Sequence, residues 1–419
     1  MIYLLLGLFL IAFGWIAWKD IRLALGIFCF LLPSYFIRFS FGHLPTTLLE
    51  LSFLVLFLVW LIKYRGYRYR DARLKNWLWP ILLFALAATL SVIISPDQTA
   101  ALGILKAYII EPILLFFIII STLKTRKDWQ YIFSGLAVSA LSISAFAIYQ
   151  KFTGAFIPEA WFDERRVTSI FGFPNAVGLY LAPIMILGFA LFYDFIKTKK
   201  YWPAVFYAIV FISSAAAIAF SKTEAAWIAV AAALFIFAMF RRELRPLAIV
   251  VAIMILIAIA FIPMLQDEVT EKIFLNDWSG QVRKVIWQES WDMLSQTPLL
   301  GAGLSGYPLA MIEFHKATYI EIFQYPHNFI LNFWSEMGIL GTIAWLWLVA
   351  RSLWITLRAQ RESNIALGLM VIFVAFLIHG LVDVPYFKND LAMMFWIFIG
   401  LAFAIEPLDK KRGHNGLSN

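Results

Sequence analysis

The chain has 419 residues, of which 62% are hydrophobic and 14% are charged, and its formal net charge is +8. A water-soluble protein of this length carries far more charge on its surface, so the composition argues against a soluble class. Apolar runs of about 20 residues, the length that spans a bilayer, recur along the whole chain. The sequence therefore predicts an all-α, polytopic membrane protein. Cys29 is the single cysteine and offers no disulfide, thiolate metal cluster or cysteine nucleophile.

Thirteen apolar segments follow one another from the first residues to the last. The first has no basic leader and no small-residue cleavage site, so it is interpreted as a retained helix. Only Lys19 and Asp20 separate it from the second segment, which makes twelve helices the alternative count. We expect one integral membrane domain over residues 1–419, built as a helix bundle without internal repeats. The segments are 2–18, 21–37, 45–62, 77–95, 101–122, 129–150, 175–196, 202–220, 224–240, 246–264, 327–350, 364–382 and 390–406.

Most of the 34 Lys and Arg residues lie in alternate loops. Basic loops stay in the cytoplasm, so the remaining loops, including 151–174, 221–223, 265–326 and 383–389, are predicted to face outward. The positive charge is thus explained by topology and by attraction to anionic membrane lipids, and it does not call for a nucleic acid partner. The basic loops are 19–22, 63–75, 124–127, 197–200, 241–245, 351–361 and 410–412.

The outward loop 265–326 is the longest polar stretch. It predicts short helices that close over a site, among them a helix over Asn276–Gln296 that carries Arg283, Trp287 and Trp291 at spacings of four, and hence on one face. Glycines 301, 303 and 306 have the form of a dinucleotide fingerprint, but they follow a helix and are interpreted as turn glycines.

Five cations are expected at the outer headgroup level, namely Arg165, Arg166, Lys222, Arg283 and Lys284. Each could bind a membrane-borne anion such as the diphosphate of a polyprenyl lipid, or only an ordinary phospholipid headgroup. The turn around Lys222 also fits a capping box, with Ser221 as N-cap and Glu224 three residues later. That alternative leaves the lysine itself unexplained.

Four ordered blocks resemble the O-antigen ligase and polymerase superfamily of bacterial envelope glycan enzymes. The resemblance covers roughly residues 150–406 and includes a late Asp383 before the last helix. The blocks are Arg166 with Phe171–Asn175, the turn Phe220–Trp227, the long loop with Arg283, Trp287 and Pro298–Gly303, and His327–Leu331 leading to Glu336, Gly338 and Gly341.

This resemblance implies a GT-C-like, inverting glycosyltransferase that needs neither a metal nor another cofactor. Such a multi-pass enzyme of the bacterial cytoplasmic (inner) membrane moves a glycan from undecaprenyl diphosphate to an acceptor hydroxyl on the extracytoplasmic face. The acceptor can be a glycan, a lipid or a protein. The resemblance assigns His327 as the base or acceptor-orienting group and Arg283 as its partner. Lys222 stands where an arginine is usual and lacks the bidentate fork of arginine, a loss for which Arg166 is the candidate to compensate.

A neutral imidazole suits the removal of a proton from a hydroxyl, and His327 is the histidine placed where the loop meets an apolar segment. The alternative is that it only caps the following helix or forms a hydrogen bond to the backbone. Asn328, Glu336 and Asp383 could orient it or bind sugar, although Glu336 could equally be a buried interhelical partner. Asn175 and Trp287 complete the candidate substrate-binding set.

Two other functions stay open. A polymerase of the same superfamily would extend a chain by repeat units, and a transporter or flippase would carry the same lipid-linked glycan. Charged residues inside the predicted helices are few and form no path across the bilayer, which disfavours transport. A metal-dependent sugar transferase is disfavoured because the first outward loop, Arg38–Thr47, contains no Asp or Glu.

Overall fold

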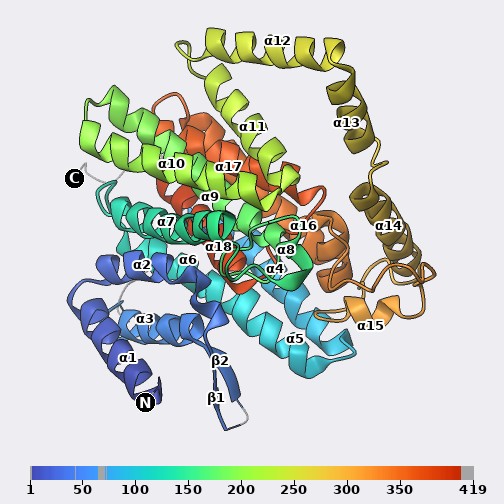
Figure 1. Cartoon of the computed structure of the whole chain (residues 1–419). Helices are drawn as coiled ribbons and strands as arrows, with labels where there is room; N and C mark the ends of the chain where they lie inside the picture. The colour runs from blue at the N-terminus through green and yellow to red at the C-terminus, as the bar shows by residue number, and fades with distance from the viewer. Residues whose placement is uncertain (1, 43, 65–70, 72, 407–419) are drawn as a thin grey trace, which may run out of the picture.

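The computed structural model describes residues 2–42, 44–64, 71 and 73–406. Several basic residues used to predict orientation, namely Arg65, Arg68, Arg70 and those of 410–412, lie outside the described residues. Within the described ranges the fold is an all-α bundle accompanied by one small hairpin, so the predicted fold class is confirmed (Figure 1).

The first half of the chain places seven α-helices in sequence, with the hairpin between the second and third. A 3₁₀ turn precedes the hairpin, and a π-helical stretch lies between the fifth and sixth helices. These elements are α1 (Ile2–Lys19), α2 (Ile21–Phe30), η1 (Leu32–Phe36), β1 (Arg38–Phe41), β2 (Leu44–Thr47), α3 (Leu48–Tyr64), α4 (Leu74–Ile94), α5 (Gln98–Ile104), η2 (Leu105–Ile110), α6 (Glu111–Thr122) and α7 (Trp129–Thr153).

The second half contains the remaining helices and the long polar loop. Its elements are α8 (Glu159–Phe162), α9 (Pro174–Lys197), α10 (Tyr201–Ser221), α11 (Glu224–Met239), α12 (Arg245–Phe261), α13 (Pro263–Ile273), α14 (Trp278–Gln296), α15 (Tyr307–Met311), α16 (Phe329–Ala359), α17 (Asn364–Gly380) and α18 (Asn389–Ile405).

Every predicted apolar segment contains helix, but not every one is long enough to cross a membrane alone. Among the described residues, six spans meet the requirements of length and hydropathy, and a seventh is added if α12 and the bent segment after it form one span. The predicted segment 21–37 is wrong as a single membrane-length helix, because α2 ends at Phe30 and the chain turns through η1, which contains Pro33. The six spans are 74–94, 98–122, 129–153, 174–197, 201–221 and 329–359.

The core of the bundle lies around α9. Of the apolar stretch of α9, 89% is buried, and the helix packs against α7, α10, α11 and α17. A helix that is covered on all sides has no polar face, which explains why α9 is apolar around its whole circumference. The last helix, α18, is similarly enclosed and packs on α6 and α16.

The two ends of the bundle differ in character. The α1–α2 and α9–α10 turns, both in basic stretches of the sequence, lie on the left of Figure 1, whereas α8, α14 and α15 lie on the right. We call these the basic end and the loop end. The 25-residue helix α7 runs from one to the other, a distance of about 37 Å.

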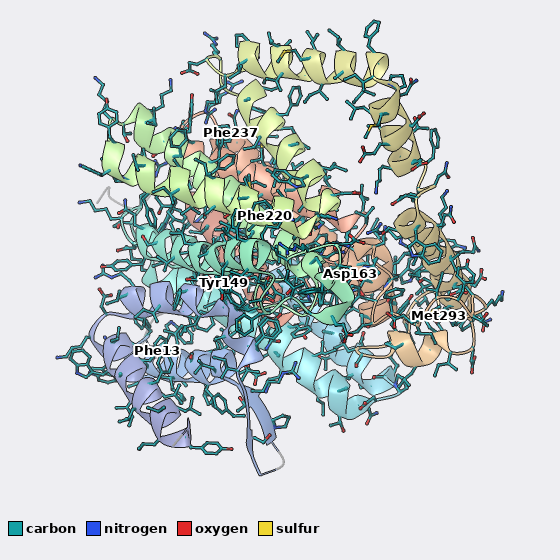
Figure 2. All side chains as sticks on the ribbon, viewed as in Figure 1. Phe13, Tyr149, Asp163, Phe220, Phe237 and Met293 are labelled. Atoms are coloured by element: carbon teal, nitrogen blue, oxygen red, sulfur yellow. The ribbon has the colours of Figure 1, made fainter. Side chains whose placement is uncertain are left out.

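Helix α12 is arranged differently from the rest. None of its residues is buried, and the chain bends by 100° between α12 and the segment that begins at Pro263. Figure 2 shows its side chains projecting from a ribbon that stands apart from the bundle, joined to it through α11 and α13. A lipid environment would cover this exposed apolar surface.

Two glycines let α2 and α7 cross at close range. A Cβ atom added to Gly135 would overlap the carbonyl oxygen of Gly26 and come within 2.9 Å of the Cβ atom of Cys29. Small residues at a helix crossing allow this backbone approach, which is a main source of attraction between helices in lipid.

We expect Gly135→Ala to destabilise the protein by about 1–3 kcal/mol, because the added methyl group must push the two backbones apart. Gly103→Ala is the matched control, since a Cβ atom there meets nothing within 4 Å. Thermal unfolding of both variants in the same detergent measures the difference. Equal midpoints for the two variants would contradict the close crossing.

Candidate functional site

Helix α14 presents one face to the rest of the molecule, as the sequence predicts. The Nε–H group of Arg283 donates to the carbonyl oxygen of Val382 at 3.1 Å. One turn later, the indole N–H of Trp287 donates to the carbonyl oxygen of Pro326 at 2.9 Å. The ring of Trp291 then packs edge-on against that of Trp334. The predicted helix is confirmed, with its first residue at Trp278 rather than Asn276.

The glycine-rich turn that follows α14 packs closely on the bundle. Gly301 and Gly303 both have positive φ angles, 72° and 83°, which favour glycine. A Cβ atom on Gly301 would overlap carbonyl oxygens of α16, and one on Gly303 would lie 2.8 Å from the carbonyl oxygen of Ser91 in α4. Their interpretation as turn glycines is confirmed.

Glu336 holds this turn from the side of α16. Its carboxylate accepts the backbone N–H group of Ser305 at 2.7 Å, and the residue is only 5% exposed. The contact corresponds to the structural alternative for Glu336, because the carboxylate joins a loop to a helix inside the protein.

The pair His327–Asn328 begins α16, and the two residues have different roles in its first turn. Asn328 is the N-cap, and its side-chain oxygen accepts the backbone N–H groups of Ile330 and Leu331. Its amide group also donates to the carbonyl oxygen of Leu381 at 3.0 Å. His327 precedes the cap in a left-handed conformation with φ of 50°. The capping alternative for His327 is therefore wrong, and the cap is Asn328.

Asp383, in the turn between α17 and α18, is the residue that His327 faces. One of its oxygens lies 3.5 Å from Nδ1 of His327 and accepts the backbone N–H group of Val384 at 2.8 Å. The other accepts the side-chain amide of Asn175 at 3.2 Å. Burial by itself would raise the pKa of Asp383, but His327, His379 and the Val384 N–H group together hold it well below its ordinary value. Asp383 is consequently a buried carboxylate in its charged form.

Three helices therefore meet at the short α17–α18 turn. Asn175 comes from the start of α9, Arg283 from α14, and His327 and Asn328 from the start of α16. The structure thus brings together five of the predicted site residues, which are separated by as much as 208 positions in the sequence.

Aromatic rings surround the imidazole of His327. The rings of Phe323 and Tyr325 are 5.2 and 5.0 Å from it, both in edge-on arrangements. The histidine side chain remains 20% exposed, while Asp383 is only 2% exposed. The imidazole is thus fixed against a buried carboxylate on one side and is still accessible from outside.

Arg166 and Lys222 lie together at the α10–α11 turn. The Nε–H group of Arg166 donates to the carbonyl oxygen of Ser221 at 3.2 Å, and its guanidinium lies over the Trp161 ring at 4.9 Å. Lys222 forms an ion pair of 3.2 Å with Glu164. Burial lowers the pKa of Arg166. These contacts join the loop after α8 to the α10–α11 turn and do not involve Asp383.

The capping box predicted at this turn is wrong. Helix α10 continues through Ser221, and Lys222 is its C-cap, with a left-handed φ of 53°. Glu224 is then the first residue of α11, too early for the third position of a capping box. The hydroxyl of Ser221 bonds instead within its own helix and to Thr223.

Residues 208–346 match the family model described as O-antigen ligase. This confirms the predicted superfamily. The matched segment runs from α10 into α16 and contains Lys222, Arg283, Trp287, His327, Asn328 and Glu336. None of the curated proteins matches the chain.

The match to this family model supports glycosyltransferase-like activity in general, with a lipid-linked glycan and an acceptor as partners. It also agrees with a multi-pass protein of the bacterial inner membrane, because the apolar helices of the described chain require a bilayer. Arg166, Asn175 and Asp383 lie outside the matched segment, so the structure alone relates them to it.

Two lysines in or near the O-antigen ligase segment were missed by the sequence reasoning. Lys272 of α13 forms ion pairs with Glu224 at 2.8 Å and Asp277 at 3.0 Å, and thereby joins the polar loop to α11. No sequence pattern connects these three residues. Lys388 is half-buried, its ammonium lies 3.7 Å from the centre of the Phe173 ring, and desolvation lowers its pKa. The sequence signal that could have identified Lys388 is its place in the same short turn as Asp383.

A second acid–histidine pair fixes the middle of the polar loop. Nδ1 of His315 is 3.0 Å from a carboxylate oxygen of Glu289, and Nε2 is 2.8 Å from the carbonyl oxygen of Ile320. Both ring nitrogens thus face acceptors, a geometry that only the imidazolium satisfies. The hydrogen bond to Glu289 raises the pKa of His315 accordingly. Glu289 also accepts the backbone N–H groups of Lys316 and Ala317.

We expect this pair to stabilise the loop at low pH and to lose its effect as pH rises. Because the pKa of His315 is raised on folding, its contribution is present below the unfolded value of about 6.5 and disappears as pH rises through the folded value. Thermal unfolding of wild type and His315→Gln between about pH 5.5 and 8.5 measures it, with the gap in midpoint largest at the acidic limit. A gap independent of pH would mean that the histidine is neutral in the folded protein.

Proposed function

We propose that the protein transfers a glycan from undecaprenyl diphosphate to an acceptor hydroxyl on the outer face of the bacterial cytoplasmic membrane. In this proposal the reaction inverts the anomeric carbon and requires no metal. The observation that carries it is the contact of His327 with the buried carboxylate of Asp383, in a turn that Arg283 also binds. A base, its orienting acid and a cation thus converge beside one loop, within a superfamily that acts on lipid-linked glycans.

His327 is the proposed general base. A carboxylate next to Nδ1 favours the tautomer with its proton on that nitrogen, which leaves the Nε2 lone pair for the acceptor hydroxyl. The acceptor oxygen attacks the anomeric carbon as its proton passes to Nε2. The bond from that carbon to the diphosphate oxygen breaks, and undecaprenyl diphosphate leaves with the electron pair. The buried negative charge of Asp383 stabilises the imidazolium that forms.

Cations at the loop end are proposed to bind the diphosphate as its charge grows. Arg283 is the main candidate. A guanidinium offers five N–H donors in a fixed plane, and two of the donors of Arg283 bond within the protein, to Val382 and Ser279, so others can meet a diphosphate. Lys222 and Arg166 lie at the neighbouring α10–α11 turn. Lys222 is half exposed and paired with an even more exposed Glu164, a weak contact that an incoming diphosphate can displace.

The other site residues are proposed to shape the place where sugars bind. Asn175 holds Asp383, and Asn328 holds the backbone of the same turn, so both position the acid. Trp287 fixes the loop at Pro326, directly before His327, and offers a ring for sugar stacking. Glu336 keeps the glycine-rich turn against α16.

The polyprenyl tail needs an apolar route beside the loop end, and α12 supports such a route. This helix is connected through α13 to the loop that carries Arg283, yet it buries none of its own residues in the bundle. After Arg245 at its first position, every side chain of the helix is apolar. A long isoprenoid lying against α12 would reach the loop end from within the bilayer.

Transfer by the purified protein in the presence of EDTA is the direct test. With an undecaprenyl-diphosphate-linked oligosaccharide and resolution of products by mass, wild type is expected to transfer the glycan. His327→Ala should lower turnover by about 10²–10⁴-fold, the usual contribution of a general base, with little change in donor binding. Product mass then distinguishes addition to another acceptor from chain extension by a polymerase. Bound donor without transfer in wild type, even when glycan and lipid acceptors are supplied, would favour a transporter.

Arg283→Ala should abolish transfer, whereas Lys284→Ala should keep it. The two residues are neighbours on α14. Arg283 contacts the α17–α18 turn, whereas Lys284 bonds to Asn276, just before its own helix. Loss of a cation that stabilises the leaving group should reduce turnover by at least about 10²-fold. Initial rates at saturating donor make the comparison. Full activity in Arg283→Ala would contradict the assigned site.

A further inference from the structure

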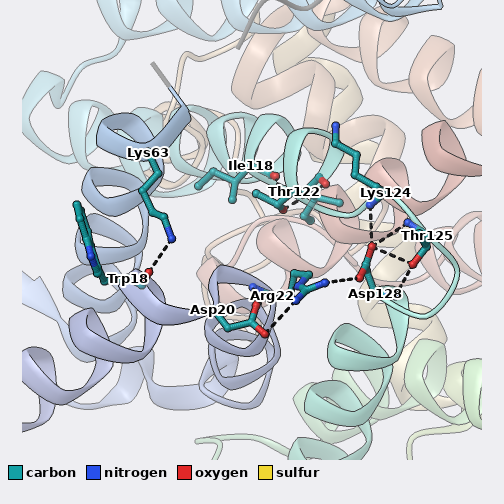
Figure 3. Close-up of polar contacts among 10 residues, drawn as sticks. Trp18, Asp20, Arg22, Lys63, Ile118, Thr122, Lys124, Thr125 and Asp128 are labelled. Carbon is teal, nitrogen blue, oxygen red and sulfur yellow. Dashed lines mark hydrogen bonds and ion pairs between the residues drawn. The ribbon is translucent and has the colours of Figure 1, made fainter. Parts of the chain in front are cut away.

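A cavity of about 1020 Å³ opens at the basic end of the bundle, far from the site described above. It lies where the α1–α2 turn, the last residues of α3 and the α6–α7 turn come together. Figure 3 shows part of its wall, with Arg22 between Asp20 and Asp128 and with Lys63 beside Trp18. Helix α7 begins beside this cavity and ends beside Gly154, close to α8, so the cavity and the loop end are about 37 Å apart.

The rim of the cavity is cationic. Its lining has two carboxylates, and both are ion-paired with the same arginine: Asp20 and Asp128 each lie 3.0 Å from Arg22. Asp128 also accepts the backbone N–H groups of Lys124 and Thr125. Arg22 can neutralise only one of these two acids, but with five basic residues against two acidic ones the described lining keeps a net positive charge. The basic lining residues are Lys19, Arg22, Lys63, Lys124 and Lys127.

Lys19 and Lys63 retain donors that can face a ligand. The ammonium of Lys63 donates to the carbonyl oxygen of Trp18 at 2.6 Å, which uses one of its three protons. The ammonium of Lys19 lies 6.0 Å from the Trp15 ring, a contact that uses no proton. Lys19 and Lys127 are both exposed. The rim thus presents several point charges with free hydrogen-bonding capacity toward one space.

Beyond the rim, the cavity wall becomes apolar. Leu23, Gly26, Ile27 and Phe30 of α2 line it at spacings of three and four residues, so they form one stripe along that helix. The stripe extends about 10 Å from the charged end of α2. Gly135 and Val138 of α7, which crosses α2 here, continue this lining. Leu23 and Val138 are each 43% exposed, so the apolar part opens to the surface of the bundle.

The ordinary preference for cations at cytoplasmic helix ends explains the presence of lysines but not this combination. Isolated anchoring lysines contact headgroups on the outside of a bundle. Here the lysines surround a recess, and an apolar stripe continues from it toward the membrane interior. A phosphate at the rim with hydrocarbon along α2 would satisfy both parts of the wall at once.

We propose that this cavity is a specific site for an anionic phospholipid of the cytoplasmic leaflet, with its phosphate at the lysine rim and its acyl chains along α2 and α7. Basic recesses between membrane helices on the cytoplasmic side are recognised binding places for anionic headgroups. The proposal rests on the contacts of the basic end and does not depend on the reaction proposed at the loop end. A lipid there would bridge α1, α2, α3 and α7 across a region that the described residues leave unfilled.

The test compares two lipids with the same acyl chains, phosphatidylglycerol and phosphatidylcholine, bound to the full-length protein in detergent and counted by native mass spectrometry. Wild type should bind one phosphatidylglycerol at least about tenfold more tightly than phosphatidylcholine, because each lysine near a phosphate contributes a factor of several. Lys19→Gln/Lys63→Gln/Lys127→Gln should lose that preference. The matched control, Lys199→Gln/Lys200→Gln/Arg242→Gln, removes the same charge from basic turns outside the cavity and should keep it.

A second variant leaves every charge in place. Val138→Trp should fill the apolar part of the cavity and weaken phosphatidylglycerol binding at least about tenfold, whereas general attraction to charge predicts no change. Equal losses in the two triple variants, or no preference in wild type, would overturn the proposal. Displacement of the lipid by glycerol 3-phosphate at similar concentration would also overturn it, and would assign the cavity to soluble phosphate esters.

Discussion

A buried negative charge at the α17–α18 turn determines how the loop end is assembled. The side chain of Asp383 is 2% exposed, and a carboxylate in such a place is tolerated only with partners. Asn175, His327 and the Val384 N–H group supply them. Removal of one partner from a buried ion pair commonly costs about 3–5 kcal/mol, so the constraint is strong enough to fix the ends of α9 and α16 relative to the turn.

The polar loop is attached to this assembly at several points along its length. Lys272 joins its beginning to α11, Arg283 and Trp287 bind its long helix to the α17–α18 turn and to Pro326, and Glu336 holds its glycine-rich turn. Each attachment pairs a polar side chain with a backbone group or an opposite charge. A loop without an apolar core of membrane length is thereby held in one arrangement, which is what a site for oriented chemistry requires.

Patterns with a short period could be predicted from the sequence, and contacts between distant elements could not. Spacings of four predict that Arg283 and Trp287 share a face, and the structure confirms it. Helix lengths were harder to predict. Hydropathy alone makes 21–37 one segment, but α2 ends at Phe30 and the chain continues as the 3₁₀ turn that contains Pro33. The capping box failed since α10 continues one residue too far for it. The role of Lys272 could not be predicted, because its partner Glu224 is distant in the sequence and only the fold brings the two together. The cavity at the basic end could not be predicted either, because it forms between helices that are far apart in the sequence.

Basic residues have different proposed roles at the two ends of the bundle. At the loop end, the proposed function requires cations to stabilise the negative charge that grows on the diphosphate only during transfer. Lys222 and Arg283 must therefore stay partly accessible. At the basic end, a resident lipid would meet lysines permanently and would stabilise the packing of α2 on α7, where Gly26 and Gly135 already bring the backbones close. Helix α7 connects the two ends, and at its loop-end terminus the side-chain oxygen of Gln150 accepts the backbone N–H group of Ser169. The same loop is joined to α10 by the hydrogen bond from the Val167 N–H group to the carbonyl oxygen of Phe220, two residues before Lys222.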